Sequence, residues 1–316
     1  MEKQLTLIID KLINEIGQVQ VLGDDKKVIT DVTADSRVVE NGSLFICLKG
    51  ATVDGHKFLK MAVEKGAVAA LVEDVPEEIP AGVTLLVVPD TRKAMEAVVP
   101  FFFDYPGKNM RMLGITGTNG KTTTTNIIRT VLRKAGYKVG LIGTINIMIE
   151  DEAVEAHNTT PDVVDLQKAL FAMKNAGCDY VVMEVSSHAL VLNRVAGCEY
   201  DCAVLSNITQ DHLDFHKTLE NYRDAKSLLF EGLANGTKEN KNAVFNMDDA
   251  SSEIIKARTK VNCLTYGKEH TNDIYPISFN VQAKEMQLKL ATPVGEMDLN
   301  LKITGEFNVY NVMSAV

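Results

Sequence analysis

The chain has 316 residues, of which 46% are hydrophobic and 24% charged, and its 33 basic and 42 acidic residues give a formal net charge of −9. This length predicts two domains of ordinary globular composition, and the acidic balance argues against nucleic acid as the main partner. No apolar run approaches the ~18 residues of a membrane span, and the first residues do not form a signal peptide. We therefore expect a cytoplasmic protein without a membrane partner. Five scattered cysteines favour buried, unpaired thiols over a metal site.

Residues 1–108 are predicted to form a small α/β domain. Apolar residues at helical spacing predict a helix from Leu5 to Ile13, and a second amphipathic segment predicts a helix from Thr91 to Phe103. Between them lie β-rich apolar runs, the last two of which we expect to be parallel strands: 28–32, 44–48, 67–72 and 83–88. Tyr105-Pro106-Gly107 is the predicted boundary.

Residues 109–316 are predicted to form a doubly wound, mostly parallel ATPase domain, because strands alternate with helices. Ligands are expected at the carboxyl ends of its strands. From 273 to 303 the apolar period becomes two, which predicts β-hairpins on the flank of this sheet. The expected strands and helices are, in chain order, 138–145, 165–176 (helix), 179–185, 203–208, 219–233 (helix), 243–246 and 262–266.

A glycine-rich stretch from 114 to 123 reads Gly-Ile-Thr-Gly-Thr-Asn-Gly-Lys-Thr-Thr between an apolar run and a helical pattern. The common phosphate-loop spacing would put glycine at Ile115, whereas here the glycines are at 114 and 117. Main-chain N–H groups of such a loop bind phosphate, a lysine reaches the β/γ oxygens and a hydroxyl binds Mg²⁺. We interpret the stretch as an ATP site formed by Gly117, Thr118, Asn119, Gly120, Lys121, Thr122 and Thr123.

Polar residues follow two of the later strands. Glu184 ends an apolar strand, where a hard oxygen ligand suits Mg²⁺, although a solvated strand-end carboxylate is the alternative. The next strand leads into a loop crowded with Asp211, His212, Asp214 and His216. His212 is the better candidate ligand for a second divalent ion, while a structural histidine is equally common at such a position.

Lys226 lies on a predicted helix with Leu229 and Phe230 one turn further on. A lysine in this setting is usually solvated or extends its amine to water. If the amine is desolvated instead, its pKa falls and it becomes nucleophilic, so it could take up CO₂ as a carbamate that bridges magnesium ions. The sequence by itself leaves both interpretations open.

Six motifs together resemble the Mur ligase family: 114–123, Asn-Thr-Thr-Pro-Asp at 158–162, Met-Glu-Val-Ser-Ser-His at 183–188, Asn-Ile-Thr-Gln-Asp-His-Leu-Asp at 207–214, Tyr-Arg-Asp-Ala-Lys-Ser-Leu-Leu-Phe at 222–230 and Gly-Glu-Phe-Asn-Val-Tyr-Asn at 305–311. Two motifs of the first domain narrow the resemblance to the family member that adds the third amino acid of the peptidoglycan stem peptide: Asp35-Ser36-Arg37 and Asp54-Gly55-His56. The resemblance covers nearly the whole chain.

The resemblance implies a set of ligands. The first domain would bind the uridine end of UDP-MurNAc-L-Ala-D-Glu, and the second would bind its sugar and peptide together with ATP and two Mg²⁺ ions. The implied residues are Ser36, Ala51, Thr52 and Val53 for uridine; Asn158, Thr159, Thr160, Ser186 and Arg194 for sugar and peptide; Asn311 for adenine; Thr122 and Glu184 for the first ion; and His212 and carbamylated Lys226 for the second.

The reaction that the resemblance implies makes an amide through an acyl phosphate, at the expense of ATP, with Lys121, Glu184, His212 and Lys226 as the catalytic set. The incoming amino acid would be meso-diaminopimelate or L-lysine. A further domain that binds it is expected beyond Val316, and the protein is expected to be a monomer. Two alternatives stay open: another ligase with the same core, such as a folylpolyglutamate synthetase, and a nucleotide-binding module without catalysis.

Overall fold

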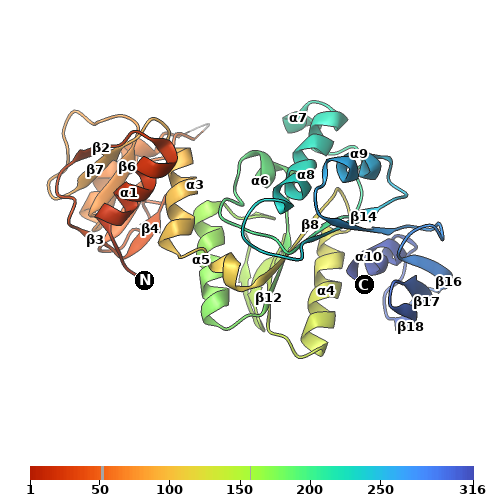
Figure 1. Cartoon of the computed structure of the whole chain (residues 1–316). Helices are drawn as coiled ribbons and strands as arrows, with labels where there is room; N and C mark the ends of the chain where they lie inside the picture. The colour runs from red at the N-terminus through yellow and green to blue at the C-terminus, as the bar shows by residue number, and fades with distance from the viewer. Residues whose placement is uncertain (51–52, 157) are drawn as a thin grey trace. The chain divides into compact units, whose positions relative to one another are not determined.

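The computed structural model describes residues 1–50, 53–156 and 158–316. The chain forms two compact units, which are described separately, and Figure 1 traces their elements. The first unit contains Met1–Pro106 together with two later segments, Asp162–Phe171 and Val195–Gly197. The second contains Gly107–Pro161, Ala172–Arg194 and Cys198–Val316. No sequence pattern indicated that segments after residue 160 belong to the first unit.

The first unit is built on a five-stranded sheet of order β2-β7-β6-β5-β4. The strands β4 to β7 are parallel, as expected for the last two, while β2 runs antiparallel to β7. The predicted strand 28–32 is divided in two, because its first half pairs with the N-terminus and its second half with β5. The elements are β1 (Lys3–Gln4), α1 (Leu5–Ile16), β2 (Gln20–Leu22), β3 (Val28–Ile29), β4 (Asp31–Thr33), β5 (Ser43–Ile46), η1 (Gly55–Phe58), α2 (Leu59–Glu64), β6 (Ala69–Val72), β7 (Thr84–Val87) and α3 (Thr91–Phe102).

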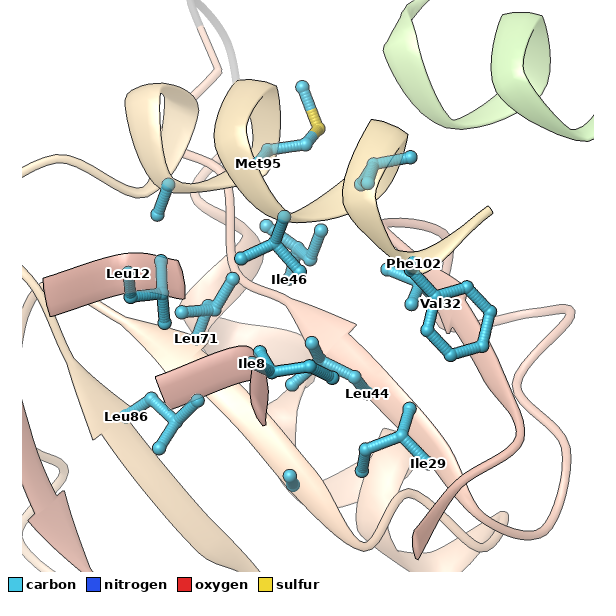
Figure 2. Packing of buried hydrophobic residues seen from close by; sticks show 14 of the residues in the cluster. Ile8, Leu12, Ile29, Val32, Leu44, Ile46, Leu71, Leu86, Met95 and Phe102 are labelled. Atoms are coloured by element: carbon cyan, nitrogen blue, oxygen red, sulfur yellow. The ribbon is translucent and has the colours of Figure 1, made fainter. Parts of the chain in front are cut away.

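The core of this unit lies where α1 and α3 pack on the sheet (Figure 2). Ile8 and Leu12 of α1 are one turn apart, so both point at Leu44 and Leu71 from the strands. All four side chains are fully buried, and each contributes about 1.5–3 kcal/mol of hydrophobic stabilisation. The amphipathic pattern of the first 16 residues therefore fixes how α1 docks.

The second unit has an eight-stranded sheet of order β11-β10-β9-β12-β8-β13-β14-β15. Six strands are parallel, and β10 and β11 form an antiparallel hairpin at one edge. The predicted strand 138–145 ends earlier, since the chain turns at Gly143 into this hairpin. The strands are β8 (Arg111–Thr116), β9 (Val139–Ile142), β10 (Asn146–Ile149), β11 (Glu152–Glu155), β12 (Tyr180–Glu184), β13 (Cys202–Leu205), β14 (Asn242–Asn246) and β15 (Asn262–Tyr266).

Helices cover both faces of this sheet, so the doubly wound α/β architecture is confirmed. Ile115 of β8 packs in the cluster that holds Ile128 of α4 and Val309 of α10, whereas the neighbouring Gly114 faces Leu229 of α8. Figure 1 shows α4 and α10 side by side. The helices are η2 (Pro106–Asn109), α4 (Lys121–Lys134), α5 (Val163–Asn175), α6 (Ser187–Val191), α7 (Leu213–His216), α8 (Leu219–Leu233), α9 (Ala250–Arg258) and α10 (Phe307–Ala315).

The period-two segment forms a separate antiparallel sheet of three strands, β16 (Tyr275–Val281), β17 (Met286–Thr292) and β18 (Gly295–Leu301). One face of β17 supplies Met286, Leu288 and Leu290 to the core of the second unit. This agrees with the hairpins predicted on the flank. Among the described residues, none of the helices has the length and apolar character needed to cross a bilayer.

Candidate nucleotide and metal site

The glycine-rich loop joins β8 to α4, and two of its glycines are required by the backbone. Gly117 has φ +143° and Gly120 has φ +88°. A Cβ atom at these positions would lie 1.9 Å from Ser206 Oγ and 2.3 Å from Asn311 Oδ1, respectively. Ile115, where the common spacing has glycine, is instead a buried strand residue. The loop therefore begins only after Thr116, which explains the shifted glycines.

A second segment, which follows β13, holds the loop in place. The main-chain N–H of Asn119 donates to Asn207 Oδ1 at 3.0 Å, and that of Thr118 donates to the main-chain oxygen of Asn207 at 2.7 Å. Ser206 Oγ donates to the main-chain oxygen of Asn119 at 2.6 Å. Sequence reasoning did not assign this role to Ser206 or Asn207, although polar residues directly after a strand were a usable signal. The loop is thus preformed, with the N-terminus of α4 aimed at its concave side.

Two lysines from distant segments meet at the loop. Lys121 Nζ and Lys226 Nζ each donate to the main-chain oxygen of Gly117 at 2.9 Å, and Lys121 also donates to that of Thr118. Burial lowers the pKa of Lys121, although the charges of Glu184 and Asp211 act in the opposite direction. Burial, reinforced by the charge of Lys121, lowers the pKa of Lys226 well below its usual value.

Lys226 lies on the buried face of α8, with only 1% of its surface exposed. Its amine lies 4.4 Å from the centre of the Tyr222 ring. The solvated interpretation is therefore wrong, and the desolvated one is correct. A lowered pKa increases the share of the neutral, nucleophilic form of a buried amine. Asp211, which the sequence analysis named in its loop without assigning it a role, interacts electrostatically with both lysines.

Glu184 ends β12, directly beside β8, and is 1% exposed. Its Oε1 accepts a hydrogen bond from the main-chain N–H of Thr144 at 3.0 Å, and its Oε2 lies 3.0 Å from Thr144 Oγ1. In the part of the chain that the structure describes, no basic side chain forms an ion pair with it. A buried carboxylate is a hard oxygen donor of the kind that Mg²⁺ prefers, and the Thr122 hydroxyl offers another oxygen at the start of α4.

His212 has a left-handed backbone, with φ +50°, at the start of α7. The centre of its ring lies 4.9 Å from that of His188, with the two rings edge-on, and 6.2 Å from that of Tyr222. His216 belongs to the same ring cluster, 5.2 Å from Tyr222 between ring centres, and its Nε2 lies 2.9 Å from Ser187 Oγ. Within the described ranges, no three acidic, histidine or cysteine side chains are arranged to hold a metal ion. His212 thus lies on the Tyr222 side of Lys226 without forming a complete ligand set.

A cavity of about 630 Å³ opens next to the loop. Asn119, Gly120, Thr123 and Asn311 line it, together with aromatic side chains that include Tyr310. The Asn311 amide donates to Asn308 Oδ1 at 2.8 Å, which fixes its orientation. The cavity is therefore large enough, and polar and aromatic enough, for a nucleoside next to bound phosphates.

The residues expected to contact sugar and peptide also lie at this end of the sheet. Thr160 Oγ1 donates to the main-chain oxygen of Glu184 at 2.9 Å and accepts from the Ser186 N–H at 3.0 Å. The Arg194 guanidinium donates to the main-chain oxygen of Thr160 at 3.4 Å. The hydroxyl oxygens of Thr159 and Thr144 are 3.1 Å apart. Asn158 is exposed.

The residues expected to contact uridine belong to the first unit. Ser36 is 7% exposed in the turn after β4, and Val53 is 50% exposed. Ala51 and Thr52 lie outside the described residues. The uridine assignment therefore stays a prediction.

Comparison with known proteins finds two family models along the chain. The model of the Mur ligase middle domain matches residues 115–316, and that of the Mur ligase family catalytic domain matches residues 28–102. A ligase of Bacillus licheniformis, UDP-N-acetylmuramoyl-L-alanyl-D-glutamate--2,6-diaminopimelate ligase, is 44% identical over 93% of this chain and 60% of its own length. The chain thus spans about 60% of the length of this relative.

Two solved structures are similar over different shares of the chain. A ligase with the same name is 28% identical, with a TM-score of 0.81 over 100% of this chain and 63% of its own. An FPGS–AMPPCP complex is 18% identical, with a TM-score of 0.54 over 70% of this chain and 61% of its own, and shows a shared fold only. With a family model that matches most of its length, the chain belongs to the Mur ligase family.

Proposed function

We propose that this chain is the nucleotide- and muramyl-binding part of an ATP-dependent amide ligase. The ligase adds diaminopimelate to UDP-MurNAc-L-Ala-D-Glu during peptidoglycan synthesis. The names of relatives more than 40% identical favour diaminopimelate over L-lysine as the incoming amino acid. The observation on which the proposal depends is the meeting of Lys121, Glu184 and Lys226 at one edge of one sheet.

This arrangement suits phosphoryl transfer to a carboxylate. The γ-carboxylate of D-Glu attacks the γ-phosphorus of ATP, the bond to the bridging oxygen breaks, and ADP leaves with an acyl phosphate formed. Both reactants are anions, so Lys121 and the N–H groups of the loop have to offset their charge. The amine of diaminopimelate then attacks the acyl carbon, phosphate leaves, and the amine loses one proton as the amide forms.

Thr122 and Glu184 are the residues proposed to hold one Mg²⁺ ion, and His212 with modified Lys226 a second. When bound, these ions would neutralise the triphosphate and the transferring phosphoryl group. For the second ion, the buried amine of Lys226 adds to CO₂, forming an N–C bond and releasing one proton. The resulting carbamate places an anion beside Lys121, at a position where a protonated Lys226 would be repelled by it.

The remaining assignments rest on the family resemblance. Asn158, Thr159, Thr160, Ser186 and Arg194 are proposed to contact sugar and peptide, and Asn311 the adenine. Ser36 with residues 51–53 is proposed to hold uridine. We propose that the protein is a cytoplasmic monomer. Sedimentation of the purified protein measures its mass in solution and thereby tests the monomeric state.

Calorimetry on this chain and a coupled assay on a version continued past Val316 test the proposal. We expect this chain to bind both ADP with Mg²⁺ and UDP-MurNAc-L-Ala-D-Glu. The longer version should release ADP and phosphate only when the muramyl dipeptide and diaminopimelate are both present. Release that is independent of the muramyl substrate would contradict the proposal. Release with folate and glutamate would favour a folylpolyglutamate synthetase, and nucleotide binding without any release a non-catalytic module.

A further inference from the structure

Thr144 contacts two segments that the proposed function uses for different ligands. It follows β9, and its N–H and hydroxyl meet the two carboxylate oxygens of Glu184, each at 3.0 Å. Its hydroxyl oxygen also lies 3.1 Å from that of Thr159. Thr144 therefore stands between a proposed metal ligand and a proposed substrate contact, and the sequence motifs do not include it.

The Thr144 hydroxyl is placed to donate to two acceptors, Glu184 Oε2 at 3.0 Å and Thr159 Oγ1 at 3.1 Å. A threonine hydroxyl has a single hydrogen, so it can make only one of these two bonds at full strength at a time. Glu184 and Thr159 thus compete for the same hydrogen, and a bond to a carboxylate is the stronger of the two.

Glu184 depends on Thr144 for its orientation. It is almost fully buried, and within the described ranges its side-chain oxygens accept hydrogen bonds from Thr144 alone. Gly143, next to Thr144, leaves room for the same oxygen, because a Cβ atom there would lie 2.6 Å from Glu184 Oε1. Removing a donor from a buried carboxylate is costly, so the Thr144 hydroxyl selects the side-chain position.

A second contact ties the same substrate segment to Glu184. Thr160, next to Thr159, donates to the main-chain oxygen of Glu184 and accepts from the N–H of Ser186. Both the backbone and the side chain of Glu184 are thereby connected to residues 159–160. A ligand that displaces either threonine changes the surroundings of the carboxylate.

We propose that Thr144 is a positioning residue that orients Glu184 for the metal–nucleotide complex and couples it to occupancy of the muramyl site. The coupling half of this inference rests on the proposed function. A substrate group that engages Thr159 Oγ1 removes the competing acceptor, so that the Thr144 hydrogen is left to Glu184. Since coupling is reciprocal, metal binding at Glu184 then changes muramyl affinity by the same factor.

Binding of Mn²⁺ in the presence of ADP, followed by electron paramagnetic resonance, tests the orienting role without turnover. Partners of metal ligands typically contribute 10–100-fold to metal affinity. We expect about tenfold weaker Mn²⁺ binding in Thr144→Val, and binding within about twofold of the parent in Thr144→Ser, which keeps the hydroxyl. Thr130→Val, on the exposed side of α4, is the matched control and should bind as the parent does.

The same titration with UDP-MurNAc-L-Ala-D-Glu present tests the coupling. We expect the muramyl substrate to change Mn²⁺ affinity in the parent and to have no effect on it in Thr144→Val or Thr159→Val. Parent-like Mn²⁺ affinity in Thr144→Val, or equal loss in Thr144→Ser, would overturn the orienting role. If the parent does not bind the muramyl dipeptide at all, the proposed function fails, while the first titration still decides the role of Thr144.

Discussion

Replacing Lys226 by methionine should make the second unit more stable. The Lys226 amine is buried, donates to one main-chain oxygen and lies beside a second lysine. Methionine has a similar length and needs neither hydration nor a hydrogen-bond partner. The substitution thus removes an unfavourable burial and should raise the free energy of unfolding. If the lysine were retained only for packing, the substitution would lower the free energy of unfolding instead.

The size of the effect follows from the cost of burying a poorly paired polar group, about 1–3 kcal/mol in mutational data. A gain of about 2 kcal/mol corresponds to a rise in Tm of roughly 4–8 °C for a unit of about 200 residues. The pH dependence has a definite sign. Folding lowers the pKa of Lys226 from 10.5, so above pH 10.5 the amine is neutral in both states and burying it has no charge penalty. The free energy of unfolding then falls as the pH decreases from 10.5 towards the folded pKa.

Guanidinium unfolding between pH 8 and pH 10.5 measures both the stability gain of Lys226→Met and the pH dependence of the parent. The parent should gain stability with rising pH by up to ~1.4 kcal/mol per pH unit from this group, and Lys226→Met should lack that contribution. Lys260→Met, at an exposed position, is the control and should stay within about 0.5 kcal/mol of the parent. A less stable Lys226→Met variant with the pH slope of the parent would refute the reasoning.

Three further predictions concern single residues. Gly117→Ala should destabilise by at least about 1 kcal/mol more than Gly136→Ala in urea unfolding, because both have positive φ but only Gly117 meets Ser206; equal losses would contradict the crowding. Leu12→Ala, in the core shown in Figure 2, should cost about 2–5 kcal/mol in the same assay, and a loss below 1 would contradict its packing. Burial raises the pKa of the Cys47 thiol to about 12, so alkylation at pH 8 should be ~1,000-fold slower than for an ordinary thiol, and rapid native-state labelling would contradict its burial.

A separate test concerns the carbamate on Lys226. In the version of the protein continued past Val316, Lys226→Ala should lose ligase activity. Added acetate should restore part of the activity, because it supplies a carboxylate in the space that the lysine side chain filled. Measured ADP release with and without acetate gives the answer. Activity that is indifferent to the substitution would remove the carbamate role.

Elements with strong local signals were predictable from the sequence. Helix α8 has the predicted bounds, since Thr218 caps it by accepting the N–H of Asn221 and its apolar face repeats at helical spacing. The strands β12 and β14 were found within a residue or two of their ends, because their apolar runs are short and bounded by polar residues. Local signals also identified the glycine loop and the carboxylate that ends β12.

Features that depend on pairing between distant segments were not predictable. The contact of Lys226 with the Gly117 oxygen joins residues 109 positions apart. The support that Ser206 and Asn207 give to the glycine loop likewise depends on β13 lying next to β8. The expectation of buried thiols is confirmed for Cys47 and Cys178, whereas Cys198, Cys202 and Cys263 are only half-buried.

A structure of the protein with ADP, Mg²⁺ and UDP-MurNAc-L-Ala-D-Glu tests the central claim most directly. The account predicts phosphate oxygens on the loop N–H groups, Lys121 turned from the Gly117 oxygen onto the phosphates, and Mg²⁺ on Thr122 and Glu184. The γ-carboxylate of D-Glu should lie next to the phosphate end of the nucleotide. Nucleotide bound elsewhere, or a muramyl peptide far from Glu184, would contradict it.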